Sequence, residues 1–143
     1  MTEATLLNAI QGQCLCGKVK VTAAKANAKV GACHCGMCRK LSSGPYLAID
    51  CGSDVTFEGQ ENVKTFDSSQ WAERAFCSNC GSNLFYRLKQ NNQHMLSLGL
   101  FDKNLPVTFD HQVFIDEKPE YYTFANKTHD MTGAEIFAQY GGK

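Results

Sequence analysis

The chain has 143 residues, of which 43% are hydrophobic and 20% charged, and its fourteen Lys and Arg residues balance its fourteen Asp and Glu residues. The formal net charge of zero and the absence of a basic cluster argue against duplex nucleic-acid binding, which requires a concentrated positive surface. We therefore expect no nucleic-acid partner. The length is that of one domain, so we expect residues 1–143 to fold as a single unit.

The N-terminal residues MTEATLLNAIQG have neither the basic segment nor the long apolar run of a signal peptide. No apolar stretch approaches the ~20 residues that a membrane-spanning helix needs, so we expect no membrane partner. These features favour a cytoplasmic protein. Thiols stay reduced in that compartment, and clustered cysteines there bind metal more often than they form disulfides.

Taken in chain order, the elements begin with residues 3–10, whose apolar spacing fits two helical turns. Short runs with a period of two follow, rich in β-branched and aromatic residues and separated by Gly, Asn and Pro. They lie at residues 18–23, 45–49, 54–59, 62–66, 83–88, 94–100 and 107–115. A helical turn is expected just after Cys38, and a short helix at 133–140. The pattern predicts a mainly β domain of antiparallel sheets with short helical segments.

Eight cysteines are the most informative residues of the chain. Cys77 and Cys80 are spaced C-x-x-C before a glycine, which suits two ligands of one metal ion. Cys14 and Cys16 are spaced C-x-C, and alternate residues of an extended strand share a face, so both sulfurs can point to the same ion. We expect these four to form a closed structural zinc site. A disulfide pair, buried free thiols and an iron–sulfur cluster are the alternatives.

Cys33, Cys35 and Cys38 form a second group, spaced C-x-C-x-x-C. Three protein ligands with an open fourth position are typical of catalytic zinc, and soft thiolate ligands favour sulfur chemistry. We expect a second zinc ion here, more easily lost or oxidised than the first. The alternative is a second structural site, closed by Cys51. His34 lies between two of the proposed ligands, and we expect its side chain to point away from the metal.

The motifs GQCLCGKV, ACHCGMCRKLSSG and ERAFCSNCGSNLF, in this order, resemble the glutathione-dependent formaldehyde-activating enzyme family, which includes the centromere protein V domain. The resemblance runs from about Gly12 to Tyr121, and the EKPEYY tail also fits. It implies a β-tent-type fold, a structural zinc on Cys14, Cys16, Cys77 and Cys80, and a second zinc on Cys33, Cys35 and Cys38.

The resemblance also implies an activity, the joining of glutathione and formaldehyde into S-(hydroxymethyl)glutathione, which is carbon–sulfur lyase chemistry run backwards. The expected partner is therefore a small thiol such as glutathione. The alternative is a non-enzymatic zinc-stabilised module that binds a small thiol or a protein partner. Three cationic residues are candidates to meet the glutathione carboxylates, and three aromatic ones to wall a pocket: Arg39, Lys40 and Arg74, and Tyr46, Phe66 and Trp71.

Overall fold

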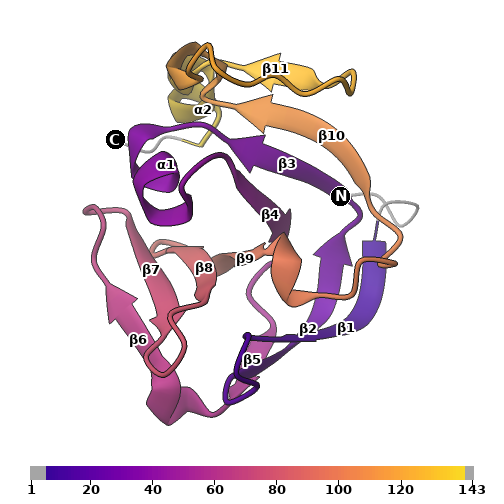
Figure 1. The fold of residues 1–143 in the computed structure, drawn as a ribbon, viewed down its shortest axis with the longest axis vertical. Coiled ribbons are helices and arrows are strands. Elements are labelled where there is room, and N and C mark those ends of the chain that lie inside the picture. Colours follow the sequence, from indigo (N-terminus) through magenta and orange to yellow (C-terminus); the bar gives the residue numbers. More distant parts are fainter. Residues whose placement is uncertain (1–5, 141–143) are drawn as a thin grey trace.

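The computed structural model describes residues 6–140, and the fold is mainly β, as the sequence predicts (Figure 1). The strands are β1 (Leu6–Gln13), β2 (Lys20–Asn27), β3 (Lys29–Cys33), β4 (Tyr46–Asp50), β5 (Val55–Glu58), β6 (Val63–Phe66), β7 (Ala72–Cys77), β8 (Asn83–Leu88), β9 (Gln93–Ser97), β10 (Thr108–Val113) and β11 (His129–Met131). The α-helices are α1 (Gly36–Ser42) and α2 (Gly133–Tyr140).

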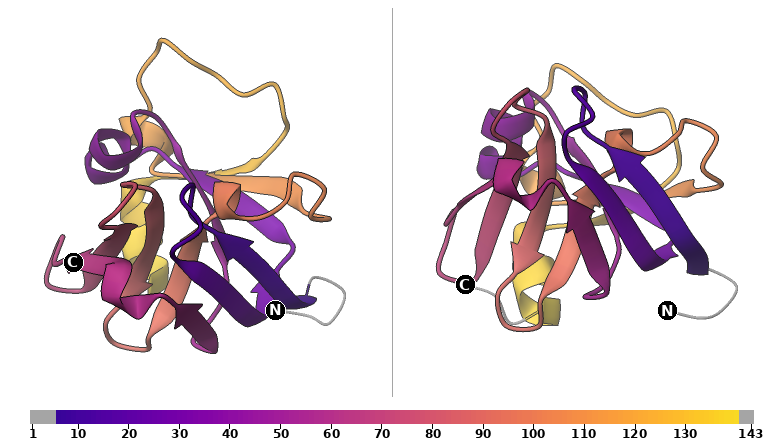
Figure 2. Two further views of the ribbon diagram at one scale, coloured as in Figure 1. Left: turned by 60° about the horizontal axis from the view of Figure 1, so that its bottom comes forward. Right: turned by 90° about the horizontal axis from the view of Figure 1, so that it is seen from below.

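The strands form two sheets. The smaller sheet has the order β1-β2-β5 and the larger β11-β10-β3-β4-β9-β8-β7-β6. Neighbouring strands are antiparallel, except that β10 runs parallel to both β3 and β11. Figure 1 shows the large sheet passing from β11 at the top of the view to β6 at the lower left, with the small sheet at the lower right. In Figure 2 the small sheet stands beside the large one and does not extend it.

The predicted helix at residues 3–10 is wrong where the structure describes it, because residues from Leu6 onward form β1. Pairing with β2 from Leu6↔Asn27 to Gln13↔Lys20 satisfies the backbone hydrogen bonds of this segment. An isolated helix of so few residues is marginal in water, and tertiary pairing overrides its local preference. Residues 3–5 of the predicted helix lie outside the described part of the chain.

One apolar core joins the two sheets. Its buried members come from both sheets, among them Ile10, Val21, Ile49, Leu84 and Leu96. A second, smaller cluster lies beside α1 and contains Cys35, Cys38, Tyr46 and Ala48, with Tyr86, Met95 and Phe114 packed against it. In this smaller apolar cluster, cysteine and aromatic side chains pack against one another.

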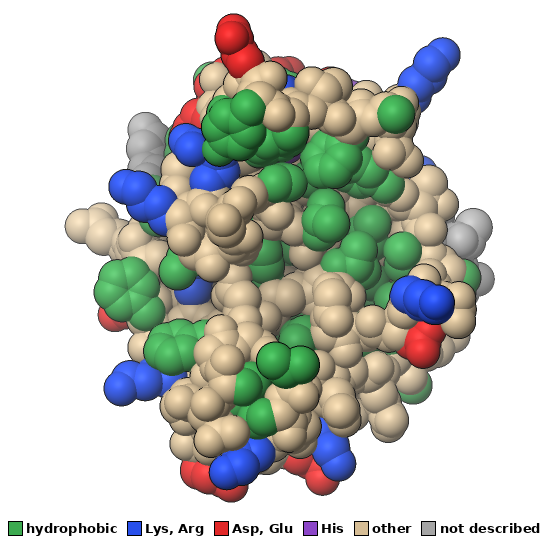
Figure 3. Space-filling model, in the orientation of Figure 1, with side chains coloured by type: hydrophobic (Ala, Val, Ile, Leu, Met, Phe, Trp, Pro, Cys, Tyr) green, Lys and Arg blue, Asp and Glu red, His purple; other side chains and the backbone are tan. Residues whose placement is uncertain are grey.

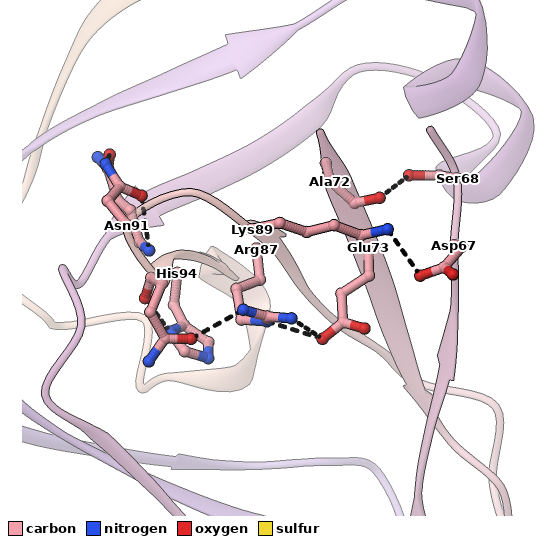
Figure 4. Close-up of polar contacts among 10 residues, drawn as sticks. Asp67, Ser68, Ala72, Glu73, Arg87, Lys89, Asn91 and His94 are labelled. Carbon is pink, nitrogen blue, oxygen red and sulfur yellow. Dashed lines mark hydrogen bonds and ion pairs between the residues drawn. The ribbon is translucent and has the colours of Figure 1, made fainter. Parts of the chain in front are cut away.

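The two faces of β7 are chemically different. On one face the half-buried Glu73 accepts from Arg87 of β8, with Oε1 2.6 Å from Nη2, and nearby Lys89 lies 3.1 Å from Asp67 (Figure 4). On the opposite side the next residue, Arg74, is only 5% exposed. Successive side chains of a strand point to opposite faces, so Glu73 is paired with an arginine on one face and Arg74 is enclosed on the other.

The two α-helices begin at residues whose side chains cap them. Cys35 is the N-cap of α1, because its Sγ accepts from the Cys38 backbone N–H at 3.4 Å. Before α2, the Thr132 hydroxyl accepts from the Glu135 N–H at 3.2 Å, and the Glu135 carboxylate accepts from the Thr132 N–H at 2.9 Å. The helix predicted at 133–140 is confirmed with the same bounds. Within residues 6–140, neither helix is long and apolar enough to cross a membrane.

Candidate metal centres

Four cysteines far apart in the sequence meet at one end of the small sheet. The sulfur atoms of Cys14, Cys16, Cys77 and Cys80 all lie within 4.8 Å of one another. The Cys14 and Cys16 sulfurs are 3.6 Å apart, and the Cys16 and Cys77 sulfurs 3.8 Å apart. Tetrahedral ligands 2.3 Å from one zinc ion would be separated by about 3.8 Å. The spacing therefore fits a single four-coordinate ion.

The loops around this cluster direct hydrogen bonds toward its sulfurs. The Val19 backbone N–H lies 3.4 Å from the Cys14 sulfur. The Ser82 hydroxyl lies 3.2 Å from the Cys80 sulfur and accepts from the Leu15 N–H at 3.0 Å. Hydrogen bonding by Ser82 lowers the pKa of Cys80 to about 5, which favours the thiolate that a metal ion requires. Because four sulfurs surround one centre, the cluster suits a structural role.

The second cluster is built by the junction between β3 and α1. Cys33 ends β3, Cys35 caps α1 and Cys38 lies in the first turn of α1, which brings their sulfurs within 4.8 Å of one another. Cys35 and Cys38 are buried, and Cys33 is half-buried. Hydrogen bonding from the neighbouring thiols holds the pKa of Cys35 far below its ordinary value, whereas hydrogen bonding to Cys35 raises that of Cys33. A cation beside the three sulfurs would favour the thiolate form of each.

Cys51 does not belong to either cluster. It lies just after β4, is 2% exposed, and packs in the main apolar core with residues such as Ile49 and Leu96. Burial raises the pKa of its thiol to about 12. Among residues 6–140, the possible metal ligands that His, Cys, Asp and Glu supply to the second cluster are the sulfurs of Cys33, Cys35 and Cys38 alone. The second cluster therefore offers one ligand fewer than the first.

Arg74 lies against the second cluster from the side of β7. Its Nη1 donates to the Cys38 sulfur at 3.4 Å, and its guanidinium lies over the ring of Tyr86, 5.0 Å from the ring centre. Burial lowers the pKa of Arg74, but the negative charges of Cys38, Cys35 and Cys33 outweigh it and raise the pKa overall. The sequence suggests this arginine as a partner of a substrate carboxylate; the structure places it beside sulfur.

His34 is fully buried, and both of its ring nitrogens have partners outside the cluster. Nδ1 lies 2.8 Å from the Tyr122 hydroxyl and Nε2 2.7 Å from Oε1 of Gln112. The amide nitrogen of Gln112 donates to the Thr128 hydroxyl at 2.9 Å, which fixes the orientation of the Gln112 side chain. The Gln112 oxygen Oε1 is therefore the acceptor in the other bond, and His34 donates to it from its ring nitrogen Nε2. Sequence reasoning missed Gln112 and Tyr122 as neighbours of this site, because they lie in β10 and in the following loop.

A cleft of about 480 Å³ lies between the elements that carry the two clusters. Its lining includes Gln13 and Leu15 next to the first cluster, Ser82 and Asn83 after Cys80, and Ser42 and Tyr46 after α1. Asn83 Nδ2 donates to the Ser42 hydroxyl at 3.1 Å, which joins the two sides. In Figure 3 the middle of this face carries uncharged and apolar side chains, and charged groups gather at its edge.

The remaining residues suggested by the sequence are distributed around the site. Tyr46 is buried against Cys35 and Cys38, and its hydroxyl bonds Ser97 at 2.9 Å. Trp71 packs edge-on against Phe137. Phe66 is 61% exposed and does not line this cleft. In the last turn of α1, Arg39 donates from Nε to the His34 carbonyl at 3.1 Å, and Lys40 is exposed.

Three comparisons relate this chain to known proteins. The sequence model of the family described as glutathione-dependent formaldehyde-activating enzyme matches residues 9–117. A Schizosaccharomyces pombe protein named as an uncharacterized lyase is 39% identical over 127 residues, which are 88% of this chain and 93% of that protein. A crystal structure of a Rhodobacter sphaeroides protein shares the fold, with a TM-score of 0.58 and 23% identity over 68% of this chain and 92% of that chain.

Proposed function

The chain belongs to the glutathione-dependent formaldehyde-activating enzyme family, and on that premise we propose that it is a zinc-dependent enzyme of the carbon–sulfur lyase type. The proposed reaction joins the sulfur of glutathione to the carbon of formaldehyde. An S–C bond forms, the carbonyl π bond opens, and the proton of the thiol ends on the former carbonyl oxygen. The reverse direction breaks the same S–C bond, which matches the lyase name of the S. pombe relative.

The observation that carries the proposal is the inequality of the two cysteine clusters. Four sulfurs meet at the first, and three at the second, within the described residues. A closed set of four ligands is typical of structural zinc, and a set of three leaves one position for a reactant. We assign one zinc ion to Cys14, Cys16, Cys77 and Cys80 and one to Cys33, Cys35 and Cys38.

The donor set fits zinc on chemical grounds, because three soft sulfur ligands are available, two of them buried. When bound, zinc would supply a positive charge that stabilises ionised sulfur at neutral pH and polarises a nearby carbonyl. The chain itself supplies the buried surroundings from Tyr46, Tyr86 and Phe114, which keep water from most of the cluster.

The cleft beside the cluster is the proposed place for the peptide part of the thiol. Its polar side chains, Gln13, Ser42 and Asn83, can hydrogen-bond amide groups, and Leu15 and Tyr46 offer apolar surface. Holding the sulfur and the carbonyl carbon together in this way removes part of the entropic barrier, by as much as about 7–11 kcal/mol in well-oriented cases.

The decisive experiment follows exchange between free and glutathione-bound ¹³C-formaldehyde by NMR, since the two combine without a catalyst as well. We expect the wild-type protein to accelerate the exchange, and Cys35→Ser to lose the acceleration. Cys51→Ala is the matched control, because it removes a buried thiol that belongs to neither cluster. Equal exchange rates with and without wild-type protein would reject the proposed reaction, and glutathione binding without acceleration would indicate a thiol-binding module instead.

A further inference from the structure

Arg74 occupies an unusual position in the middle of β7. The strand ends at Cys77, a member of the first cluster, and Arg74 precedes it by three residues. Because side chains alternate along a strand, residues three positions apart, such as Arg74 and Cys77, point to opposite faces of β7. Cys77 thus faces the main core and the first cluster, and Arg74 faces α1 and the second cluster. One strand contributes to both centres.

The guanidinium is buried without a carboxylate partner. Arg74 is 5% exposed, and no carboxylate oxygen of residues 6–140 lies within 4.0 Å of it. Its contacts are the Cys38 sulfur at 3.4 Å and the face of Tyr86 at 5.0 Å. Its Nε has no hydrogen-bond partner among the described residues. Buried arginines are normally paired with a negative group, so the charge must be balanced by the cysteines.

The charges of the second cluster supply that balance. Three thiolates and one divalent cation together carry one net negative charge, which a single arginine neutralises. The first cluster has four sulfurs, and an exposed cysteine, Cys16, lets water solvate the excess charge there. The second cluster is more enclosed, with Cys35 and Cys38 both buried, and has no comparable contact with water at those two sulfurs. A fixed cation is needed beside it for this reason.

We propose that Arg74 is the counter-charge of the three-cysteine cluster, a positioning residue that holds its sulfurs ready for a divalent metal and favours a further anionic sulfur beside them. This inference rests on the proposed function in that it assigns a metal to the cluster. It goes beyond that function because it assigns a role to a residue that is neither a ligand nor part of the cleft. Arginine suits the role because its flat cation can donate to sulfur and stack on Tyr86 at once.

The test compares zinc affinity in full-length variants, by competition with a chromophoric chelator that resolves the two sites. Arg74→Met removes the charge and keeps much of the volume. Arg87→Met is the matched control, because it removes an arginine from the adjacent strand, where Arg87 pairs with Glu73 (Figure 4). We expect Arg74→Met to weaken the second site by roughly 10–100-fold, the range typical of partners of metal ligands, and to leave the first site unchanged.

Two further readouts separate this role from a merely structural one. Cobalt in place of zinc reports the second site by its sulfur-to-metal charge-transfer absorption, which Arg74→Met should shift and Arg87→Met should not. Arg74→Lys keeps the charge and should recover part of the affinity, whereas Arg74→Gln should not. These two variants decide the matter if Arg74→Met loses both metals by unfolding.

Equal second-site affinity in Arg74→Met and Arg87→Met overturns the inference, as does equal affinity in Arg74→Lys and Arg74→Gln. Either result would leave the proposed function standing, provided the wild-type protein binds two zinc ions. Wild-type protein that binds zinc only at the first cluster would reject the metal assignment of the proposed function, and this inference with it.

Discussion

Nε2 of His34 donates to Oε1 of Gln112 at 2.7 Å, across a separation of 78 residues. This bond joins the loop between Cys33 and Cys35 to β10, the strand that runs parallel to β3. The opposite ring nitrogen accepts from Tyr122. The backbone between two proposed metal ligands is therefore fixed by a histidine that ligates nothing, and the spacing of the sulfurs depends on that anchoring.

Replacing Gln112 with Leu should weaken this anchoring. The buried His34 Nε2 would lose its acceptor, which costs about 1–3 kcal/mol of unfolding free energy. We also expect the second zinc site to lose affinity by roughly 10-fold or more. Urea unfolding and chelator competition measure the two effects. Gln93→Leu is the control, since Gln93 is half-buried and donates to Asp50 away from both clusters. Unchanged zinc affinity in Gln112→Leu would show that His34 only fills space.

Zinc content should distinguish the two clusters directly. We expect two zinc ions per wild-type chain, one in folded Cys35→Ser, and loss of folded structure in Cys77→Ser. The reason is that the first cluster ties the loop after β1 to the end of β7, whereas the second lies within one β3–α1 junction. Elemental analysis and circular dichroism give the readout, with Cys51→Ala as the variant that keeps both ions. A Cys35→Ser protein as unfolded as Cys77→Ser would make the second site structural.

Local pattern predicted the elements whose alternation is regular. Residues 83–88 coincide with β8, and the helix at 133–140 with α2. The pattern does not predict β3 and β7, because glycine and charged residues interrupt their alternation, nor β11, which is only three residues long. The sequence suggests a surface position for Arg74, and its burial follows from contacts with Cys38 of α1 and the ring of Tyr86 that the local pattern does not show. β7 lies inside the large sheet, where tertiary contacts and not local preference fix the strand.

The cysteine spacing likewise predicted which sulfurs gather, because ligand geometry restricts the choices strongly. Spacing carries no information about the surroundings of the cluster. Gln112 and Tyr122 reach His34 only through the parallel pairing of β10 with β3 and the loop that follows. Parallel pairing joins segments distant in the sequence, and a period-two pattern does not reveal its partner.

The C-terminal helix α2 lies beyond residues 9–117, the part matched by the family, yet it packs toward the second cluster. Phe137 meets Trp71 and Phe114 edge-on, with ring centres 6.2 and 5.6 Å away, and Phe114 packs against the cysteines. Phe137 is 38% exposed, so we expect Phe137→Ala to lower the unfolding free energy by about 1–2 kcal/mol, chiefly from the two lost aromatic contacts. Phe66→Ala should change it by less than about 0.5 kcal/mol, because Phe66 is 61% exposed.

Thermal and urea unfolding of these two variants tests the comparison. Equal stabilities of Phe137→Ala and Phe66→Ala would mean that α2 contributes no packing energy to the fold. If the prediction holds, a chain ending before residue 133 should unfold at a lower denaturant concentration than the full chain. It should keep the first zinc ion, because none of the four cysteines of the first cluster lies in α2.

Filling the cleft should separate thiol binding from metal binding. Ser42 lines the cleft and accepts from Asn83, and Phe in its place would project a ring into the space of about 480 Å³. We expect Ser42→Phe to weaken glutathione binding at least 10-fold, because the peptide part of the ligand loses its place, while two zinc ions remain bound. Titration calorimetry with glutathione and elemental analysis measure the two quantities. Ser53→Phe, at an exposed serine that does not line the cleft, is the matched control. Unchanged glutathione affinity in Ser42→Phe would reject this cleft as the place where the peptide part of the thiol binds.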